Sequence, residues 1–219
     1  MGSMYPGRVG IGVGSGEELN ETAVVRGAWP TPGKRLEMLE EALKVMSLLW
    51  GSTGPITFEG SYYSLTNATL FTRPPKPIPV YFSAIGPRAS RMAGLLGDHL
   101  ITVARDPKIL KDVIIPNFEA GAREAGKDPA TMERALAVLY FYDPEHLVDP
   151  EAMKVSASEA KIEVAGEGSQ MELWHSPEDI IGRIEEWKRL GFDHLIFGNF
   201  SADCDAGLRV FDKVLPHVD

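Results

Sequence analysis

Residues 8–21 read RVGIGVGSGEELNE, and this stretch decides the fold that the sequence predicts. Arg8 to Val13 form a short apolar run with glycine on both sides, which is typical of a strand buried in a sheet. The run leads into the turn Gly14-Ser15-Gly16, and two acidic residues follow it. In α/β proteins the sites lie on the loops after the strands, so this loop is the first place to look for function.

Four further apolar runs along the chain predict four more strands of the same sheet. They span Pro79 to Ala84, His99 to Val103, Ala135 to Tyr142 and His194 to Phe197. Helical spacing or helix-start signals mark residues 36–50, 86–96, 107–125, 176–190 and 206–215, and residues 55–65 predict a hairpin. The polar stretch from Asp143 to Glu172 predicts helix in part, with a loop at residues 166–169. Strands that alternate with helices indicate a parallel sheet covered by helices.

We expect one α/β domain over residues 1–219, of the (β/α)₈ TIM-barrel type but shortened to about five β/α units. A complete barrel typically takes about 250 residues, and the chain has 219. Five parallel strands leave two open edges, and such edges tend to pair with another chain. We therefore predict a homo-oligomer, or else a longer protein or an earlier start of translation that supplies the remaining units.

Composition excludes several classes of function. The formal charge is −9 and the isoelectric point is near 5.1, which argues against binding nucleic acid through a basic face. No apolar run approaches the ~20 residues of a membrane span, and no signal peptide is visible. The single cysteine, Cys204, fits a reducing compartment, and the five histidines lack metal-ligand spacing. We expect a cytoplasmic protein with a small-molecule substrate, without a metal, a membrane or a nucleic-acid partner.

Two strand-end loops carry the first candidate site residues. Glu17 follows the first strand, where a carboxylate can act as a general acid or base, and Asn20 offers a donor and an acceptor to the edge of a heterocycle. After the second strand, Gly86-Pro87 opens a helix whose free N–H groups favour an anion. Both loops also have a plainer interpretation, as a helix-capping polar loop and as an ordinary Gly-Pro turn.

A third loop follows the strand that ends at Val103. Thr102 brings a hydroxyl group to this strand end, and Arg105 brings a cation. We expect Thr102 to contact the substrate. This pattern is weaker than the other two because it consists of isolated residues.

The stretch Met4–Glu21 resembles the fourth-strand motif of the luciferase-like barrel superfamily. Its likeness is greatest to the branch that uses the deazaflavin coenzyme F420, such as the F420-dependent glucose-6-phosphate dehydrogenases. Shorter likenesses lie at residues 35–50, 58–63, 79–81, 86–87, 93–94, 97–98, 176–178 and 191–195. The resemblance covers nearly the whole chain and corresponds to the carboxy-terminal two-thirds of the family barrel.

The resemblance implies an oxidoreductase that transfers hydride between the deazaflavin C5 and a carbon of a small organic substrate, at CH–OH or similar. It implies Glu17 as the active-site carboxylate and Asn20 as a contact of the coenzyme ring system. It implies that Gly86, Pro87, Ala89 and Ser90 hold the phosphate-bearing tail of the coenzyme.

The sequence departs from the family pattern in two ways. Three β/α units that precede this region in the family are absent, and with them a histidine thought to assist catalysis. The lysine of the sugar-phosphate enzymes is not evident in residues 102–108, so glucose 6-phosphate is not the expected substrate. Two alternatives stay open: a monooxygenase of the same superfamily that uses flavin mononucleotide (FMN), and a fragment that binds cofactor or assembles with a partner without catalysis.

Overall fold

The computed structural model describes residues 1–24, 27–147 and 171–218. Most of the predicted partly helical stretch between Asp143 and Glu172, including its loop at residues 166–169, lies outside the described residues.

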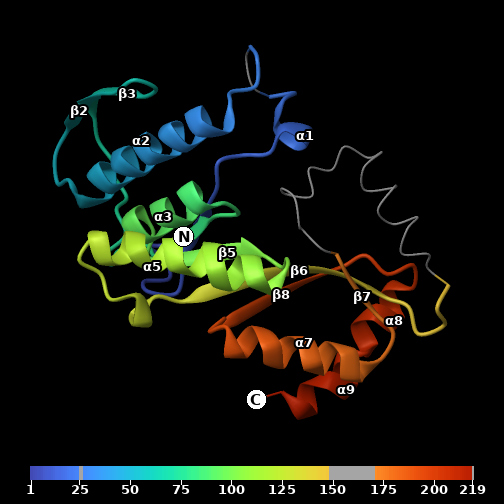
Figure 1. Ribbon diagram of the computed structural model, residues 1–219. Coiled ribbons are helices and arrows are strands. Elements are labelled where there is room, and N and C mark those ends of the chain that lie inside the picture. The colour runs from blue at the N-terminus through green and yellow to red at the C-terminus, as the bar shows by residue number, and fades with distance from the viewer. Residues whose placement is uncertain (25–26, 148–170, 219) are drawn as a thin grey trace.

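A twisted parallel sheet of six strands runs through the middle of the molecule (Figure 1). Its strands are β1 (Ile11–Val13), β4 (Val80–Ser83), β5 (His99–Val103), β6 (Arg134–Tyr142), β7 (Glu172–Trp174) and β8 (His194–Asn199). The order is β1-β4-β5-β6-β7, β8 also pairs with β6, and every pairing is parallel. This confirms the α/β class. The prediction of five strands was one short, because β7 is only three residues long and lies beside a polar stretch.

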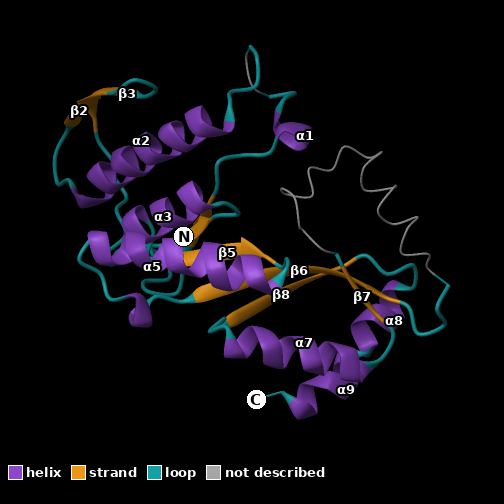
Figure 2. Ribbon diagram, in the orientation of Figure 1, coloured by secondary structure: helices purple, strands orange, loops and turns teal. Residues whose placement is uncertain are grey.

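The helices pack against one face of this sheet (Figure 2). They are α3 (Pro87–Leu96), α4 (Pro107–Ile109), α5 (Ile115–Glu124), α7 (Pro177–Arg189), α8 (Cys204–Arg209) and α9 (Phe211–Val214). Alternate strand residues such as Phe82, Leu100 and Leu136 are fully buried and meet Phe118 and Trp187 from the helices in one core. Burial of this apolar area is the main favourable contribution to the stability of the fold.

Two predicted helices depart from regular α geometry. The helix predicted over residues 107–125 contains a π-helical turn, Leu110–Ile114, between α4 and α5. Pro116 follows this turn and has no N–H group, so a regular α ladder could not be completed there. The helix predicted over residues 206–215 is split into α8, α9 and a 3₁₀ turn, Leu215–His217.

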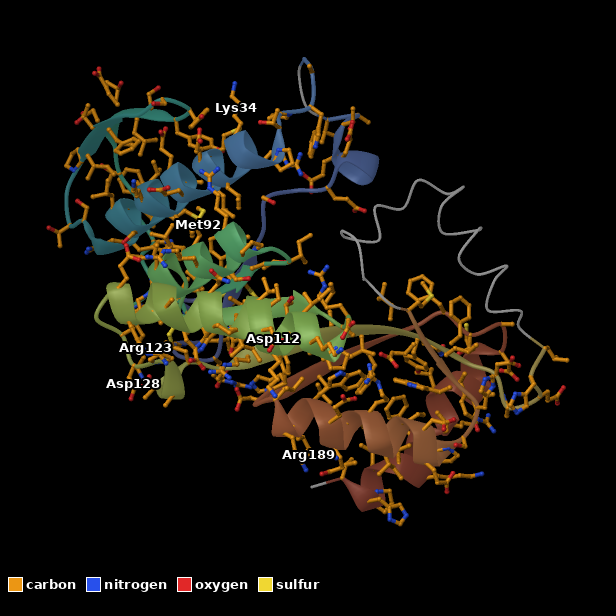
Figure 3. All side chains as sticks on the ribbon, viewed as in Figure 1. Lys34, Met92, Asp112, Arg123, Asp128 and Arg189 are labelled. Atoms are coloured by element: carbon orange, nitrogen blue, oxygen red, sulfur yellow. The ribbon has the colours of Figure 1, made fainter. Side chains whose placement is uncertain are left out.

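An excursion between β1 and β4 consists of α1 (Glu18–Glu21), α2 (Pro32–Gly51) and the antiparallel hairpin β2 (Ile56–Glu59) and β3 (Ser64–Ala68). Met92 of α3, labelled in Figure 3, lies where α3 faces α2. The carboxylate of Glu41 accepts hydrogen bonds from three backbone N–H groups of the hairpin turn, at residues 61–63, at 2.6–2.8 Å. Burial works to raise the pKa of Glu41, but these N–H groups hold it below its ordinary value.

The other face of the sheet carries no helix among the described residues. Along β6 and β8 the side chains on this face include Leu139, which is 36% exposed, and Ile196, which is 52% exposed. In the described chain β1 pairs only with β4, and β8 pairs only with β6. The described sheet therefore has the open edges that a shortened barrel predicts, and in addition one of its faces exposes apolar side chains.

A polar cluster closes the amino-terminal edge of the sheet. The Tyr81 hydroxyl donates to the carboxylate of Glu133, and His194 Nε2 lies 3.2 Å from the same carboxylate oxygen. The Glu133 N–H donates to His99 Nδ1 at 3.0 Å, and the His99 and Tyr81 rings lie 4.5 Å apart. These four residues stand at the starts of β4, β5, β6 and β8, so the cluster joins four strands.

Candidate active site at the carboxyl edge of the sheet

The three loops chosen from the sequence meet at the same edge of the sheet. β1 and β4 are parallel neighbours with Val13 opposite Phe82, so the Gly14 turn lies beside the end of β4. A Cβ atom on Gly14 would lie 3.4 Å from Ser83 Cβ. The end of β5 adjoins in turn, because the Ala84 N–H donates to the Ile101 carbonyl at 2.9 Å. The loops of Glu17, Gly86 and Thr102 therefore lie at one edge of the sheet, which we call the rim.

Glu17 is half-buried and lies directly before α1, at the N-cap position. Its N–H group donates to the Glu21 carboxylate at 3.2 Å. Gly16 has φ +84°, a left-handed conformation that favours glycine, and it sets the direction in which the chain enters α1. Asn20 lies within α1, and its side chain lies outside the described part of the structure.

The helix α3 begins as the sequence predicts, with Gly86 at the N-cap and Pro87 at the first position. Gly86 has no side chain with which to cap this terminus, so the N–H groups of the first turn, which Pro87 lacks, can face an anion. Ser90 is fully buried, and its hydroxyl donates to the Gly86 carbonyl at 2.8 Å. Ser90 therefore stabilises the turn from within and presents no hydroxyl at the rim.

Both arginines of this helix pair with carboxylates of neighbouring helices. Arg88 pairs with Glu37 of α2 at 3.4 Å, and Arg91 pairs with Glu124 of α5. Both pairs are exposed, and pairs of this kind contribute about 0–1 kcal/mol. The available donors at the start of α3 are those of the backbone.

Thr102 is fully buried on the same face of β5 as Leu100, toward the helices. Its hydroxyl oxygen has no hydrogen-bond partner within the described residues. The predicted substrate contact at Thr102 therefore gains no support from its position. Arg105 is 5% exposed, and its guanidinium donates to the Ile85 carbonyl, which ties the third loop to the second. Burial lowers the pKa of Arg105 from its ordinary value.

Between the first two loops the inner face of β1 is bare backbone. Gly12 lies in the middle of β1, and Gly10 and Gly14 flank the strand. A Cβ atom on Gly12 would meet no atom within 4 Å, whereas one on Gly10 would lie 3.2 Å from the Tyr81 ring. Ser83, an exposed residue at the end of β4, borders this strip. Sequence reasoning missed Ser83 because a lone serine at a strand end belongs to no motif.

This arrangement fits a flat, anionic coenzyme. The side-chain-free strip leaves space for a ring system to approach the sheet, and the uncapped start of α3 suits a phosphate. Among the described residues no three His, Cys, Asp or Glu side chains are grouped so that they could hold a metal ion. The same residues include no helix with the length and apolar character that crossing a membrane requires.

The fold defines an α/β barrel-type protein, and its candidate site lies at the carboxyl ends of the strands. The family model of the luciferase-like monooxygenases matches residues 1–152, and the chain belongs to this family. A protein of Microbacterium testaceum named F420-dependent glucose-6-phosphate dehydrogenase is 32% identical, over all of this chain and 71% of its own length. A protein of the same name from Nakamurella multipartita is also 32% identical and is covered over 70% of its length.

Solved structures agree with this assignment. An F420-dependent secondary alcohol dehydrogenase, solved in complex with an F420–acetone adduct, is 40% identical with a TM-score of 0.83. The match covers 99% of this chain and 72% of that protein. The coenzyme F420-dependent tetrahydromethanopterin reductase of Methanopyrus kandleri has a TM-score of 0.65 at 19% identity, and this likeness shows the fold alone. The predictions of the family and of the barrel-type fold are therefore confirmed.

Proposed function

We propose that this chain is an F420-dependent oxidoreductase that transfers hydride between the deazaflavin and the CH–OH carbon of a small organic substrate. One observation carries the proposal: the Glu17 turn and the start of α3 follow neighbouring parallel strands at one edge of the sheet, and the open backbone of Gly12 lies in the first of these strands. The relatives named above, at 32–40% identity, are F420-dependent dehydrogenases.

The residues divide the work by their positions. The start of α3, formed by Gly86, Pro87 and Ala89 and held by the buried Ser90, would bind the phosphate of the coenzyme tail through its free backbone N–H groups, which Pro87 lacks. Asn20 would bind the edge of the ring system. Glu17 would exchange a proton with the substrate oxygen, and the coenzyme, when bound, supplies or accepts the hydride.

Substitution of the proposed proton-transfer group gives the first test. Glu17→Gln should lower turnover by about 10²–10⁴-fold, because the amide cannot take up or release the proton. The dissociation constant for F420, followed by coenzyme fluorescence, should stay within about twofold. Glu18→Gln is the matched control, since Glu18 is the exposed neighbour. Equal losses of turnover and of affinity would mean that Glu17 only shapes the site.

Coenzyme choice is tested by titrating the protein with F420 and with FMN. Saturable binding of F420 alone supports the proposal, and binding of FMN alone favours the flavin monooxygenase alternative.

Substrate choice follows from the third loop. Arg105 is buried and bonded to the Ile85 carbonyl, so it is not presented to a sugar phosphate at the rim. We therefore assign a small secondary alcohol or its ketone, in line with the relative that is 40% identical. Reduction of F420 with propan-2-ol and with glucose 6-phosphate compares the two classes. Faster reduction with the sugar phosphate would contradict the assignment.

Association belongs to the same proposal. The open edges of β1 and β8 and the apolar inner face favour a homo-oligomer in which another copy covers them. Size-exclusion chromatography with light scattering should give more than one copy per particle. A monomer with a cooperative melt would contradict this expectation. The cytoplasmic location remains a prediction, which localisation of a tagged protein tests.

A further inference from the structure

Arg35, in the first turn of α2, holds the loop that carries Glu17. Its Nε donates to the Ser15 carbonyl at 3.1 Å, and its Nη1 donates to the Pro30 carbonyl at 2.8 Å. Its guanidinium carbon lies 5.1 Å from the centre of the Trp29 ring, within the range of a cation–π contact. One half-buried cation thus joins the turn after β1 to the segment before α2.

The contact at Ser15 lies two residues from Glu17. Gly16 separates them and, as a glycine with φ +84°, gives the chain little stiffness of its own. The α1 helix that follows has four residues, too few to be stable without support from the surroundings. The place of Glu17 therefore depends on anchors on both sides, Arg35 before it and the Glu21 carboxylate at its own N–H.

Trp29 also contacts the turn, and we call Arg35 and Trp29 together the clamp. A Cβ atom on Gly16 would lie 3.4 Å from the Trp29 ring, so the indole packs over the turn while the guanidinium packs over the indole. Arginine suits this position because its planar fork bonds two carbonyls and stacks on an aromatic face at the same time. A lysine keeps the charge but lacks the planar fork, so it could not stack on the indole and bond both carbonyls with the same geometry.

We propose that Arg35 is a positioning residue, which fixes the Ser15-Gly16 turn so that the Glu17 carboxylate meets the substrate. The inference rests on the proposed function, since it takes Glu17 as the proton-exchanging group. Arg35 bonds the backbone carbonyls of Ser15 and Pro30, so its proposed role is to hold the turn and not to react. Its loss should act through geometry, and a displacement of about 1 Å can lower turnover about 10²-fold.

Hydrogen exchange tests the clamp without any coenzyme. The variants are Arg35→Met, Arg35→Lys and the control Lys34→Met, whose side chain points outward from α2 (Figure 3). In Arg35→Met the amides of residues 15–21 should exchange about tenfold faster, with an intermediate effect in Arg35→Lys and none in Lys34→Met. Unchanged exchange in Arg35→Met, or an equal increase along the whole chain, would overturn the inference.

A double-mutant cycle tests whether the clamp acts through Glu17. Arg35→Met should lower kcat about 10²-fold and leave the F420 dissociation constant within about twofold. In the Glu17→Gln background, Arg35→Met should lower kcat by at most about twofold, because the carboxylate that Arg35 positions is gone. The same fall in kcat in both backgrounds would overturn the inference. Full turnover in Glu17→Gln alone would instead refute the proposed function, and the exchange result would tell the two failures apart.

Discussion

At the scale of single residues, the turn before Glu17 shows how one backbone conformation determines a site. In Gly16→Ala, an L-residue at φ +84° costs about 1 kcal/mol. The new Cβ would lie 2.6 Å from Glu21 Oε2, so the Glu21 carboxylate, which accepts from the Glu17 N–H, must shift. We expect the free energy of unfolding in urea to fall by about 1 kcal/mol and proteolysis within residues 14–24 to speed up. Gly51→Ala, at the exposed end of α2 with no atom within 4 Å, should show neither change.

Residue-scale reasoning from sequence found the parts of the site that are chain-local. Gly86 and Pro87 were recognisable because a Gly-Pro pair before a helical pattern commonly starts a helix. The structure has a helix start at this point. The contacts of Arg35 and Ser83, and the direction of the Thr102 side chain, could not be predicted in this way. They depend on how one helix or strand packs against another. Those contacts join residues that are distant in sequence, and no local pattern contains them.

At the scale of elements, the crossing of α3 and α5 is set by two glycines. A Cβ atom on Gly94 would lie 2.0 Å from the Phe118 carbonyl oxygen, and one on Gly121 would lie 2.0 Å from that of Arg91. Both obstacles are backbone atoms, so Gly94→Ala must separate the helices, at a cost of about 1–3 kcal/mol. Gly182→Ala in α7 meets no atom within 4 Å and should stabilise the protein by about 0.5–1 kcal/mol. Urea titration of both variants checks the prediction, and equal effects would refute it.

Helices and strands were predicted correctly where the period of the apolar residues agreed with the Gly, Pro and capping residues at the ends of the element. The bounds of β5 and α3 and the start of α7 after Ser176 follow the sequence closely. It failed for β7, which is too short to show a period, and for the π turn before Pro116, where the missing N–H changes the winding without ending the helix. It also joined α8 and α9 into one helix.

At the scale of the whole molecule, the cluster at the amino-terminal edge makes stability depend on pH at both ends of the range. The hydrogen bond from Tyr81, with a smaller contribution from His194, holds the pKa of Glu133 below its ordinary value of 4.5. The bond to Glu133, together with burial, raises the pKa of Tyr81 from 10.0 to about 12. The Glu133 contribution is therefore present above pH 4.5 and lost as the pH falls through the folded value. The Tyr81 contribution is complete below pH 10.0 and lost as the pH rises through about 12.

Tyr81→Phe isolates this effect. We expect the wild type to be more stable than the variant by about 1 kcal/mol between about pH 5 and 10, and this advantage to shrink on either side. Urea titrations across the range measure it, and an absorbance titration of tyrosinate locates the Tyr81 transition. Tyr63→Phe, which alters an exposed tyrosine, should behave like the wild type at every pH. A stability difference between wild type and Tyr81→Phe that does not vary with pH would refute the coupling between Tyr81 and Glu133.

The open inner face of β1 at Gly12 allows the distance between the sheet and a bound coenzyme to be measured by substitution. Because position 12 opens onto empty space, alanine, serine, valine and leucine can be introduced in turn without disturbing the packed side of the strand. The size at which coenzyme affinity first collapses would then report the clearance between the sheet and the bound ring.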